Sequence, residues 1–219
     1  MKYTSFLALG LVIFFVSSIT TANALPPCSS NHDTIWNECE GVWTGTDGGE
    51  YSGTWKNDKR HGQGTITWPN GQRYIGAWVN DRRHGHGTHT RPDGLKYVGE
   101  FRNDHPHGEG MWTWTDGQEY VGTFEYGKPE GTGTHTWPDG HQYTGNFLSG
   151  LSHGHGTYTW ANGRVYTGEW KYDKMDGYGV VKFVDGRIWA GEFSQGSWVK
   201  GNKYAPGEAP QDVTAKFQE

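Results

Sequence analysis

The chain has 219 residues, a formal net charge of −5 and a hydrophobic fraction of only 33%. The negative charge argues against nucleic acid and against anionic membranes as partners of the whole molecule. Its 12 Trp, 12 Tyr and 9 Phe argue equally against a disordered polar chain, which would lack such side chains. Most of the apolar area therefore lies in aromatic rings, and few aliphatic residues are left for a conventional globular core.

The N-terminus has the features of a secretory signal peptide. Lys2 gives a positive start, residues 6–16 are apolar, and residues 22–24 (Ala-Asn-Ala) have the small side chains of a cleavage site. The apolar run is too short for a membrane span, and the residues before Cys28 do not form a lipoprotein cleavage box. We expect residues 1–24 to be a signal peptide and the chain to be periplasmic or secreted.

The two cysteines, Cys28 and Cys39, both follow the expected cleavage point closely. A close pair in an exported chain predicts a disulfide, which would pin a leader segment over residues 25–40. A zinc site is not indicated, because the chain has no second cysteine pair.

From residue 51 onward, one aromatic pattern recurs every 23 residues. Each copy begins with Tyr, or with Trp in the last place, has Gly two residues later and a large aromatic residue two residues further on. Twelve of these aromatic residues form a predicted structural ladder: Tyr51, Trp55, Tyr74, Trp78, Tyr97, Phe101, Tyr120, Phe124, Tyr143, Phe147, Tyr166 and Trp170. A fixed period of this length indicates a repeat architecture.

Each copy predicts a β-hairpin. In the second copy, residues 74–79 alternate with the period of a strand, residues 80–83 form a polar turn, and residues 85–91 form a Thr-containing return strand. Pro, Asp and Gly at residues 92–94 then turn the chain into the next copy. Helices are not expected here, because no window has apolar residues at helical spacing.

The alternation places the aromatic residues and repeated glycines on one face and the threonines on the other. Glycine in mid-strand is unfavourable, so we expect these glycines to make room for rings from the neighbouring strand. Hairpins stacked edge to edge would form one antiparallel sheet of about 14 strands that twists and curls around its aromatic face. The predicted fold class is all-β, an elongated solenoid of tandem hairpins.

The repeat array is expected over residues 41–198, as a half repeat, six full repeats and a second half repeat. Residues 199–219 lose the pattern and predict a C-terminal cap followed by a tail.

The unit Tyr-x-Gly-x-Trp/Phe, followed by His-Gly-x-Gly and a further Gly, resembles the MORN repeat, and matching copies cover residues 41 to about 198. Two copies depart from it by placing Glu130 and Asp176 where the others have His, and a third has Gly150 in place of the turn Asp. The resemblance implies an elongated curved sheet with an attachment or scaffolding role, phospholipid contact in some relatives, and no catalytic residues.

Basic and titratable residues gather in the first two copies and predict a polar or anion-binding site on an otherwise acidic chain. The candidates are Lys59, Arg60, Arg82, Arg83, His86, His89 and Arg91. A solvated loop is the alternative explanation for the basic residues.

Metal sites and catalytic sites are not expected. His84 and His86 are spaced to share one face of a strand, but no Cys or carboxylate completes a site at a fixed spacing. Asp93 and its equivalents suggest calcium, yet turn formation explains them fully. Motifs for a nucleophile elbow, a phosphate loop or a zinc protease are absent, so we expect no enzyme activity and no cofactor.

Three functions remain after these exclusions. We favour a non-catalytic scaffold for protein–protein interaction or attachment outside the cytoplasm. The alternatives are phospholipid binding through the basic loops and glycan binding on Trp112, Trp114, Trp137 and Trp160. The expected partner is a protein, and unpaired strand edges at the ends of the array also allow a homodimer.

Overall fold

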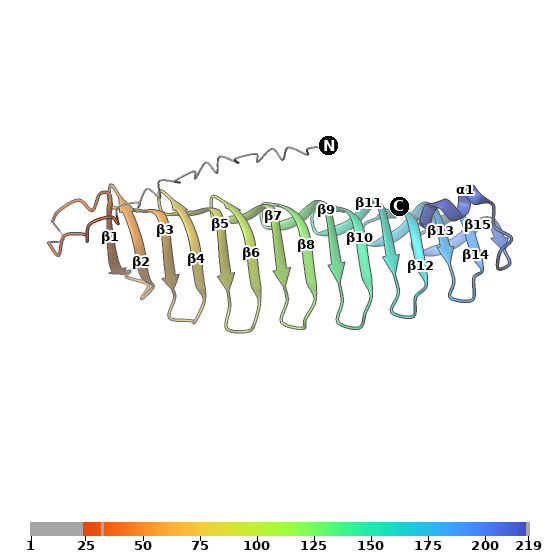
Figure 1. The fold of residues 1–219 in the computed structure, drawn as a ribbon, viewed down its shortest axis with the longest axis horizontal. Helices are drawn as coiled ribbons and strands as arrows, with labels where there is room; N and C mark the ends of the chain where they lie inside the picture. Colours follow the sequence, from red (N-terminus) through yellow and green to blue (C-terminus); the bar gives the residue numbers. More distant parts are fainter. Residues whose placement is uncertain (1–23, 32, 218–219) are drawn as a thin grey trace, which may run out of the picture.

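A computed structural model describes residues 24–31 and 33–217, which form one long open sheet with a short helix near one end (Figure 1). The predicted signal peptide falls on residues 1–24 and so lies, apart from Ala24, outside the described residues. The strands are β1 (Cys39–Thr44), β2 (Glu50–Lys56), β3 (Lys59–Thr67), β4 (Arg73–Val79), β5 (Arg82–Thr90), β6 (Lys96–Arg102), β7 (His105–Thr113), β8 (Glu119–Glu125), β9 (Lys128–Thr136), β10 (Gln142–Leu148), β11 (Leu151–Thr159), β12 (Val165–Lys171), β13 (Lys174–Lys182), β14 (Ile188–Ser194) and β15 (Ser197–Tyr204). They are followed by α1 (Gln211–Thr214) and a 3-10 turn, η1 (Ala215–Phe217).

The strands follow one another in the sheet in sequence order, and each is antiparallel to the next. The predicted fold class, an all-β array of hairpins, is therefore confirmed. The sheet has 15 strands in place of the expected number of about 14, because it begins at Cys39 and continues through Tyr204. The predicted array boundary at residue 198 thus falls inside β15.

The hairpins are closed by two-residue turns in which both residues have positive φ. Asn57 and Asp58 have φ of 50° and 58°, and Asn80 and Asp81 have 49° and 68°. This pair of positive angles belongs to the type I′ turn, whose twist matches that of the flanking strands. The longer connections between hairpins are Asx turns, in which the side chain of Asp93 or its equivalent accepts a hydrogen bond from the backbone N–H two residues later.

A row of glycines crosses the whole sheet. Gly53 pairs with Gly64, Gly64 pairs with Gly76, and the row continues in the same way from Gly41 on β1 to Gly201 on β15. A Cβ atom on Gly64 would meet the ring of Tyr51 from the neighbouring strand. The predicted reason for the repeated glycines is therefore confirmed: the tyrosine rings lie directly on the backbone.

The core is a single file of rings that pack edge to face. Tyr74 contacts Trp78 of its own strand at 5.2 Å and Phe101 of the next repeat at 5.0 Å, and each Tyr from Tyr51 to Tyr166 repeats this arrangement. Each of these tyrosines is at most 2% exposed. Such T-shaped contacts are a favoured geometry for aromatic pairs, so the predicted ladder forms the core.

The sheet curls because every hairpin contains a bulge. Between Gly53 and Trp55 the register to β3 shifts, so that Trp55 pairs with Arg60. The same shift occurs in the later hairpins. A bulge bends the strand that contains it, which brings the turn end and the loop end of each hairpin over the aromatic face.

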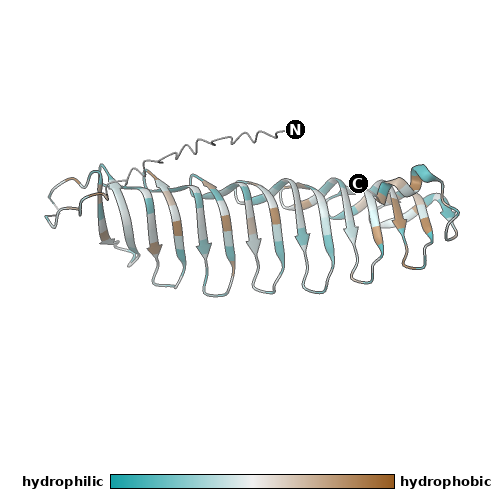
Figure 2. Cartoon of the chain, viewed as in Figure 1, coloured by the Kyte–Doolittle hydropathy of each residue, from teal (hydrophilic) through white to brown (hydrophobic). Residues whose placement is uncertain are grey.

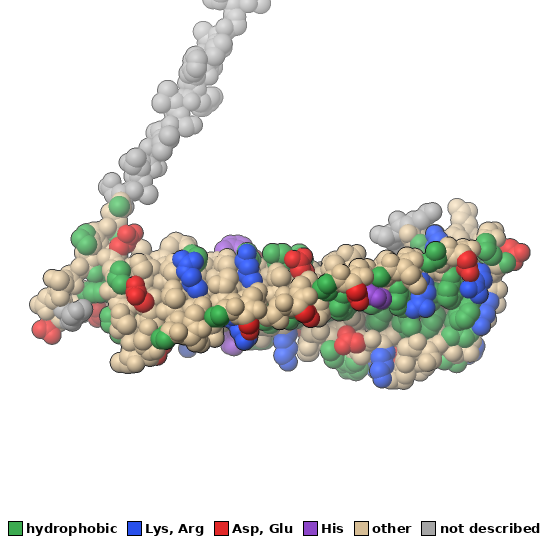
Figure 3. Space-filling view, turned by 90° about the horizontal axis from the view of Figure 1, so that it is seen from below, with side chains coloured by type: hydrophobic (Ala, Val, Ile, Leu, Met, Phe, Trp, Pro, Cys, Tyr) green, Lys and Arg blue, Asp and Glu red, His purple; other side chains and the backbone are tan. Residues whose placement is uncertain are grey.

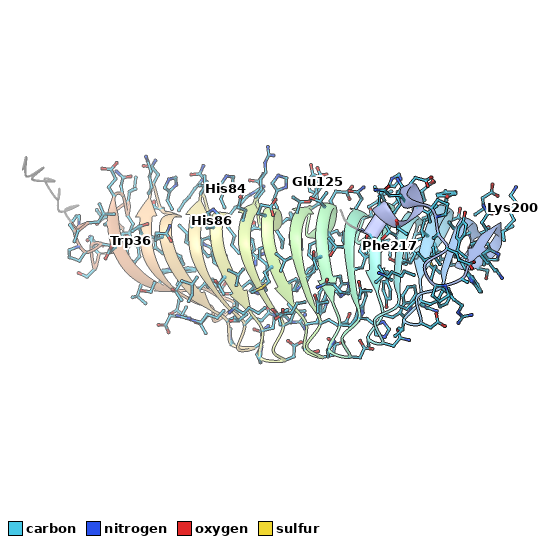
Figure 4. All side chains as sticks on the ribbon, turned by 45° about the vertical axis from the view of Figure 1, so that its right-hand side comes forward. Trp36, His84, His86, Glu125, Lys200 and Phe217 are labelled. Carbon is cyan, nitrogen blue, oxygen red and sulfur yellow. A yellow bond between two sulfur atoms is a disulfide. The ribbon has the colours of Figure 1, made fainter. Side chains whose placement is uncertain are left out.

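A further tryptophan ring covers each end of the file of rings. At the N-terminal end a disulfide joins Cys28 to Cys39, as predicted, and Trp36 packs edge to face on Trp55 at 5.1 Å (Figure 4). At the other end Trp198 packs on Phe193 at 5.3 Å. The leader is thus part of the folded array.

The C-terminal segment covers the face of the sheet opposite the rings. Val213 of α1 packs with Val180, Ile188 and Ala190, and Phe217 lies over the last strands (Figure 4). Val180 stands where four of the five earlier copies have Thr, so this part of the polar face is apolar. The described helices are too short to cross a membrane.

The hydropathy of the strands is intermediate along most of their length (Figure 2). Gly, Thr, Trp and Tyr dominate them, and none of these residues is extreme on that scale. On the face shown in Figure 3, hydrophobic side chains gather toward the C-terminal end.

Candidate functional site: the aromatic groove

A groove of about 1020 Å³ lies on the aromatic face, beside the leader and the first repeats. Rings on the strands form its floor, with Trp43, Tyr51, Trp55, Ile66, Trp78 and His89 among the lining residues. One rim consists of Asp58, Arg60, Asp81, Arg83 and Asp104 at the turn end of the hairpins. The other consists of residues of the loop end, including Thr46, Asp47, Trp68 and Gln72.

The turn rim is built from an interaction that links consecutive repeats. Asp81 Oδ1 accepts hydrogen bonds from the backbone N–H of Arg60 at 2.9 Å and from its Nε at 3.2 Å, while Arg60 Nη2 donates to the Asp81 carbonyl at 3.0 Å. Arg83 and Asp104 repeat the arrangement at 3.0, 3.4 and 2.7 Å. Each arginine is therefore held by the turn of the following hairpin.

The two arginines also lie over rings of the floor. Arg60 Cζ is 4.5 Å from the centre of the Trp78 ring, and Arg83 Cζ is 5.3 Å from that of Phe101. A cation over an aromatic face is attracted by the ring quadrupole. Ring and carboxylate together hold each guanidinium group in a half-buried position, with side-chain exposures of 26% and 21%.

The first turn of the array has the carboxylate without the arginine. Asp58 Oδ1 accepts the backbone N–H of Trp36 at 2.7 Å, as Asp81 accepts that of Arg60. The Asp58 N–H donates in return to the Trp36 carbonyl at 2.9 Å. Trp36 thus takes the place of an arginine, its ring packs on Trp55, and no cation pairs with Asp58 among the described residues.

The predicted anion-binding residues separate into three groups. Arg60, Arg83 and His89 line the groove, and Arg91 forms an ion pair with Asp93 at 2.8 Å. Three others lie outside the groove lining: Lys59, Arg82 and His86. Anion binding remains a prediction, and in the groove the carboxylates outnumber the arginines by four to two.

The titratable side chains of the groove floor and of the core beside it are shifted away from ionisation. Burial lowers the pKa of His89 below its ordinary value, and the nearby Arg83 and Arg91 lower it further. Burial also raises the pKa of Tyr74 to about 12 and that of Tyr51 well above its usual range. At neutral pH these groups are therefore uncharged.

A second aromatic feature continues along the middle of the array. This aromatic ledge consists of Trp112, Trp114, His135, Trp137, Tyr158 and Trp160. Trp112, Trp114, His135 and Trp137 stack in sequence with centroid distances of 5.4, 5.1 and 4.0 Å. The rings are half-buried, so the ledge keeps exposed ring surface.

Within residues 24–31 and 33–217, no group of three or more His, Cys, Asp and Glu side chains is arranged to hold a metal ion. His86 lies opposite Glu100 on the face away from the rings. The turn aspartates that suggested calcium use Oδ1 to accept backbone N–H groups.

The sequence reasoning missed Trp36, Trp43, Asp47 and Asp58 as groove residues. The 23-residue period does not point to Trp36, because the residue 23 places before Arg60 is Asn37. In the structure it is the N–H of Trp36, one residue earlier, that binds Asp58 as the N–H of Arg60 binds Asp81. Asp58 was identifiable as the first of the turn aspartates, and Trp43 from its place before the first Tyr.

A family model described as "MORN repeat" matches six tandem segments, at residues 51–73, 74–96, 97–119, 120–142, 143–163 and 166–186. The chain belongs to the MORN-repeat family. The resemblance inferred from the sequence is thereby confirmed. MORN repeats form a non-catalytic scaffold used for interactions with proteins and membranes.

Solved structures share only a general likeness with this MORN array. The TCP domain of Drosophila melanogaster SAS-4 (dCPAP), solved with a proline-rich motif of Ana2, is 10% identical with a TM-score of 0.40, and the match covers 69% of this chain and 77% of that one. The wild-type TCP10 domain of Danio rerio CPAP is 15% identical with a TM-score of 0.29, over 68% and 86% of the two chains. No curated protein matches the chain significantly.

Proposed function

We propose that this MORN array is a non-catalytic scaffold outside the cytoplasm that binds a protein partner in its aromatic groove. The observation that carries the proposal is the groove itself, about 1020 Å³ in volume, with aromatic rings on its floor and polar groups on both rims. An aromatic centre within a polar rim is the usual composition of a protein interface.

Ring surface remains available in the groove after the core is built. The tyrosines and Trp78 are buried and serve the fold, but Trp43 is 45% exposed. A large exposed aromatic side chain beside a hollow is typical of a binding anchor. The groove therefore offers contact area that folding does not use.

Two features support a location outside the cytoplasm. The first is the signal-peptide pattern of residues 1–24, and the second is the Cys28–Cys39 disulfide. Disulfides persist in oxidising compartments and are rare in the cytosol.

The test is site-specific photocrosslinking in the native compartment. The photoreactive amino acid benzoylphenylalanine is introduced at His89, which lines the groove, or at His86, on the same strand but on the opposite face. We expect a discrete protein adduct from position 89 that position 86 does not give. Identical adducts from both positions, or no protein adduct from position 89, would overturn the proposal.

Glycan binding is a second candidate, because the aromatic ledge presents stacked rings that are only half-buried. Sugars stack on such platforms through their apolar faces. Here we expect a red-shifted Trp emission that responds to a sugar polymer, and an emission that does not respond would exclude glycan binding.

Phospholipid binding through the exposed Lys59 and Arg82 remains a prediction, which flotation with anionic vesicles at low salt would test.

A further inference from the structure

The polar face of the sheet, opposite the rings, is not polar throughout. One row of residues crosses the strands on this face, each residue directly opposite the next. From β4 to β8 this row forms a line that we call the apolar stripe: Ile75, Thr88, Val98, Met111 and Val121. Figure 2 shows hydrophobic segments within β4, β6 and β8. From β9 to β12 the same row has only threonine: Thr134, Thr144, Thr157 and Thr167.

The stripe contributes no buried side chain to the fold. Ile75 is 42% exposed and Val121 is 52% exposed, while Val98 and Met111 are half-buried. None of the four belongs to the clusters of buried residues that hold the described part of the chain together. An exposed apolar surface that the core does not use is typical of an interaction site.

The C-terminal end of the same row shows what kind of segment covers it. There the row continues from β12 to Val180 and then to Ala190, and Val213 of α1 packs with both. Under this cover Val180 is 1% exposed and Ala190 is 4% exposed. Where this row is apolar at the end of the array, the protein therefore covers it with a short helical segment.

Opposite charges flank the apolar stripe. Residues two places before and after a stripe residue lie on the same face of the strand. On the side toward the hairpin turns these are Glu100 and Glu109, and on the side toward the longer loops they are Arg73 and Lys96. Glu119 ends the basic side at β8. Glu100, Glu109, Arg73 and Lys96 form no ion pair with any described residue, so both charges are free to meet a partner.

We propose that the apolar stripe binds an amphipathic helix of a protein partner, whose apolar side lies on Val98, Met111 and Val121. Its polar sides carry basic residues toward the turns and acidic residues toward the loops, because these complement the two flanks. The oppositely charged flanks also set the direction in which the helix lies. The inference goes beyond the proposed function, since it assigns a second interaction surface on the face opposite the groove.

The stripe also has the dimensions of a helix. Five neighbouring strands span about 19 Å, which is the length of a helix of about 13 residues. One helical turn advances about 5.4 Å, close to the spacing of about 4.8 Å between strands. The apolar residues of successive turns would therefore meet successive strands. At its N-terminal end the stripe runs into a hollow of about 600 Å³ whose lining includes Ile75, Val42, Leu25 and Pro27.

The experiment measures binding of a designed helical peptide to the oxidised full-length exported protein by fluorescence anisotropy. The peptide has about 15 residues, with leucine at every third or fourth position, lysine along one side of the leucine face and glutamate along the other. The control peptide has the same leucines and has glutamine at every charged position. The same hydrocarbon staple, on the side away from the leucines, holds both peptides helical.

We expect the charged peptide to bind at least about tenfold more tightly than the glutamine peptide. The reason is that only the charged peptide complements both flanks of the stripe. Equal binding of the two peptides, or no binding of either, would overturn the inference.

The repeats themselves supply a matched pair of variants that locates the site. Val98→Thr combined with Val121→Thr introduces the residue that Thr144 and Thr167 provide at the equivalent positions of later repeats, so the fold should be kept. Thr144→Ser combined with Thr167→Ser is the control, in the same row but outside the stripe. We expect the first pair to weaken the charged peptide about tenfold and the control pair to leave it unchanged. Equal effects of the two pairs would overturn the site.

Two other occupants of the stripe would give different results. Sedimentation equilibrium that shows a dimer, lost in the Val98→Thr, Val121→Thr variant, would assign the stripe to a second copy of the chain. Flotation with vesicles of phosphatidylcholine and phosphatidylglycerol, lost in the same variant, would assign it to a membrane. Either result would overturn the inference of a partner helix.

The outcomes also separate this inference from the proposed function. Loss of crosslinking from His89 would remove the groove partner and leave the peptide binding at the stripe, whereas failure of the peptide would remove the stripe and leave the groove. His86 lies opposite Glu100 beside the stripe. An adduct of the stripe partner from position 86 would therefore differ in mass from the groove adduct of position 89.

Discussion

At the scale of single residues, the array depends on the contact between tyrosine and glycine. The ring of each ladder tyrosine lies on the glycine row, and its hydroxyl donates to the backbone carbonyl three residues later, as Tyr120 does to Thr123 at 3.0 Å. The tyrosine side chain combines a flat ring, which fits over the glycines, with a hydroxyl that is far enough from its own Cα atom to reach this carbonyl. The same pair explains why the residue types recur so regularly.

Replacing one of these glycines should destabilise the fold strongly. A Cβ atom on Gly133 would lie 2.6 Å from Cε2 of Tyr120 and in contact with its hydroxyl. We expect Gly133→Ala to lower the free energy of unfolding by about 1–3 kcal/mol in urea denaturation, because the buried ring must shift. Thr132→Ala is the control, on the same strand but exposed on the opposite face. Equal losses for the two variants would contradict the packing explanation.

The buried tyrosines should also make the fold sensitive to alkali. Burial raises the pKa of Tyr74 to about 12, while an unfolded tyrosine ionises near 10. Below pH 10 the proton is bound in both states, and between pH 10 and 12 only the folded state keeps it. We therefore expect the free energy of unfolding to fall as pH rises from 10 to 12, measured by urea denaturation at each pH. A free energy that is constant over this range would contradict the burial of the hydroxyls.

Two departures from the repeat pattern compensate for missing turn aspartates. Three turns have no Asp: Tyr126-Gly127, Ser149-Gly150 and Gln195-Gly196. Glu130 accepts the Ser149 N–H at 2.8 Å, and Asp176 accepts the Gln195 N–H at 3.0 Å. In both cases the carboxylate belongs to the earlier repeat and binds the turn of the following one, whereas Asp81 lies in the following turn and binds the earlier Arg60. This link gives a physical reason for the replacement of His at both positions.

At the scale of elements, the leader acts as a substitute for a preceding repeat. It reproduces the link between repeats, because Trp36 and Asp58 exchange the same backbone hydrogen bonds as Arg60 and Asp81. The disulfide holds this substitute in place. Its loop of 11 residues is short, so its contribution is on the order of 3 kcal/mol.

Reducing the disulfide should release the leader without unfolding the array. We expect faster hydrogen exchange at the Asp58 amide, which donates to the Trp36 carbonyl, when Cys28 and Cys39 are reduced. The Gly127 amide, which donates to Pro106 in the middle of the array, should not change. Exchange that accelerates equally at both amides would show that the disulfide stabilises the whole sheet.

At the scale of the molecule, the described part of the chain is one sheet whose repeats pack against their neighbours along the array. Within that part, a second layer is present only where α1 and η1 cover Val180, Ile188 and Ala190. Stability in such an array is close to a sum of repeats and of the interfaces between them. Its length should therefore be adjustable.

Deleting one whole repeat should leave a folded, shorter protein. Removal of residues 97–119 takes out 23 residues and joins equivalent positions of neighbouring copies. We expect a cooperative urea transition with a smaller m-value, because less surface is exposed on unfolding. Removal of residues 97–107 is the control, since it shifts the glycine row and should abolish the transition. Loss of folding in both variants would contradict the additive description.

The sequence by itself determined the fold class, the succession of hairpins, the disulfide and the aromatic face. These features depend on local alternation, on turn residues and on a strict period, all of which are written along the chain. The predicted turn over residues 80–83 is too long, because the two-residue turn Asn80-Asp81 lets β5 begin at Arg82. The groove was decided only by the tertiary structure. The bulges curl the sheet so that Asp58, Trp43 and Asp47, at different ends of the hairpins, line one hollow. The same curl pairs Arg60 with Asp81 across repeats, so a stretch that looks basic in the sequence becomes, in three dimensions, a groove with unpaired carboxylates at its end.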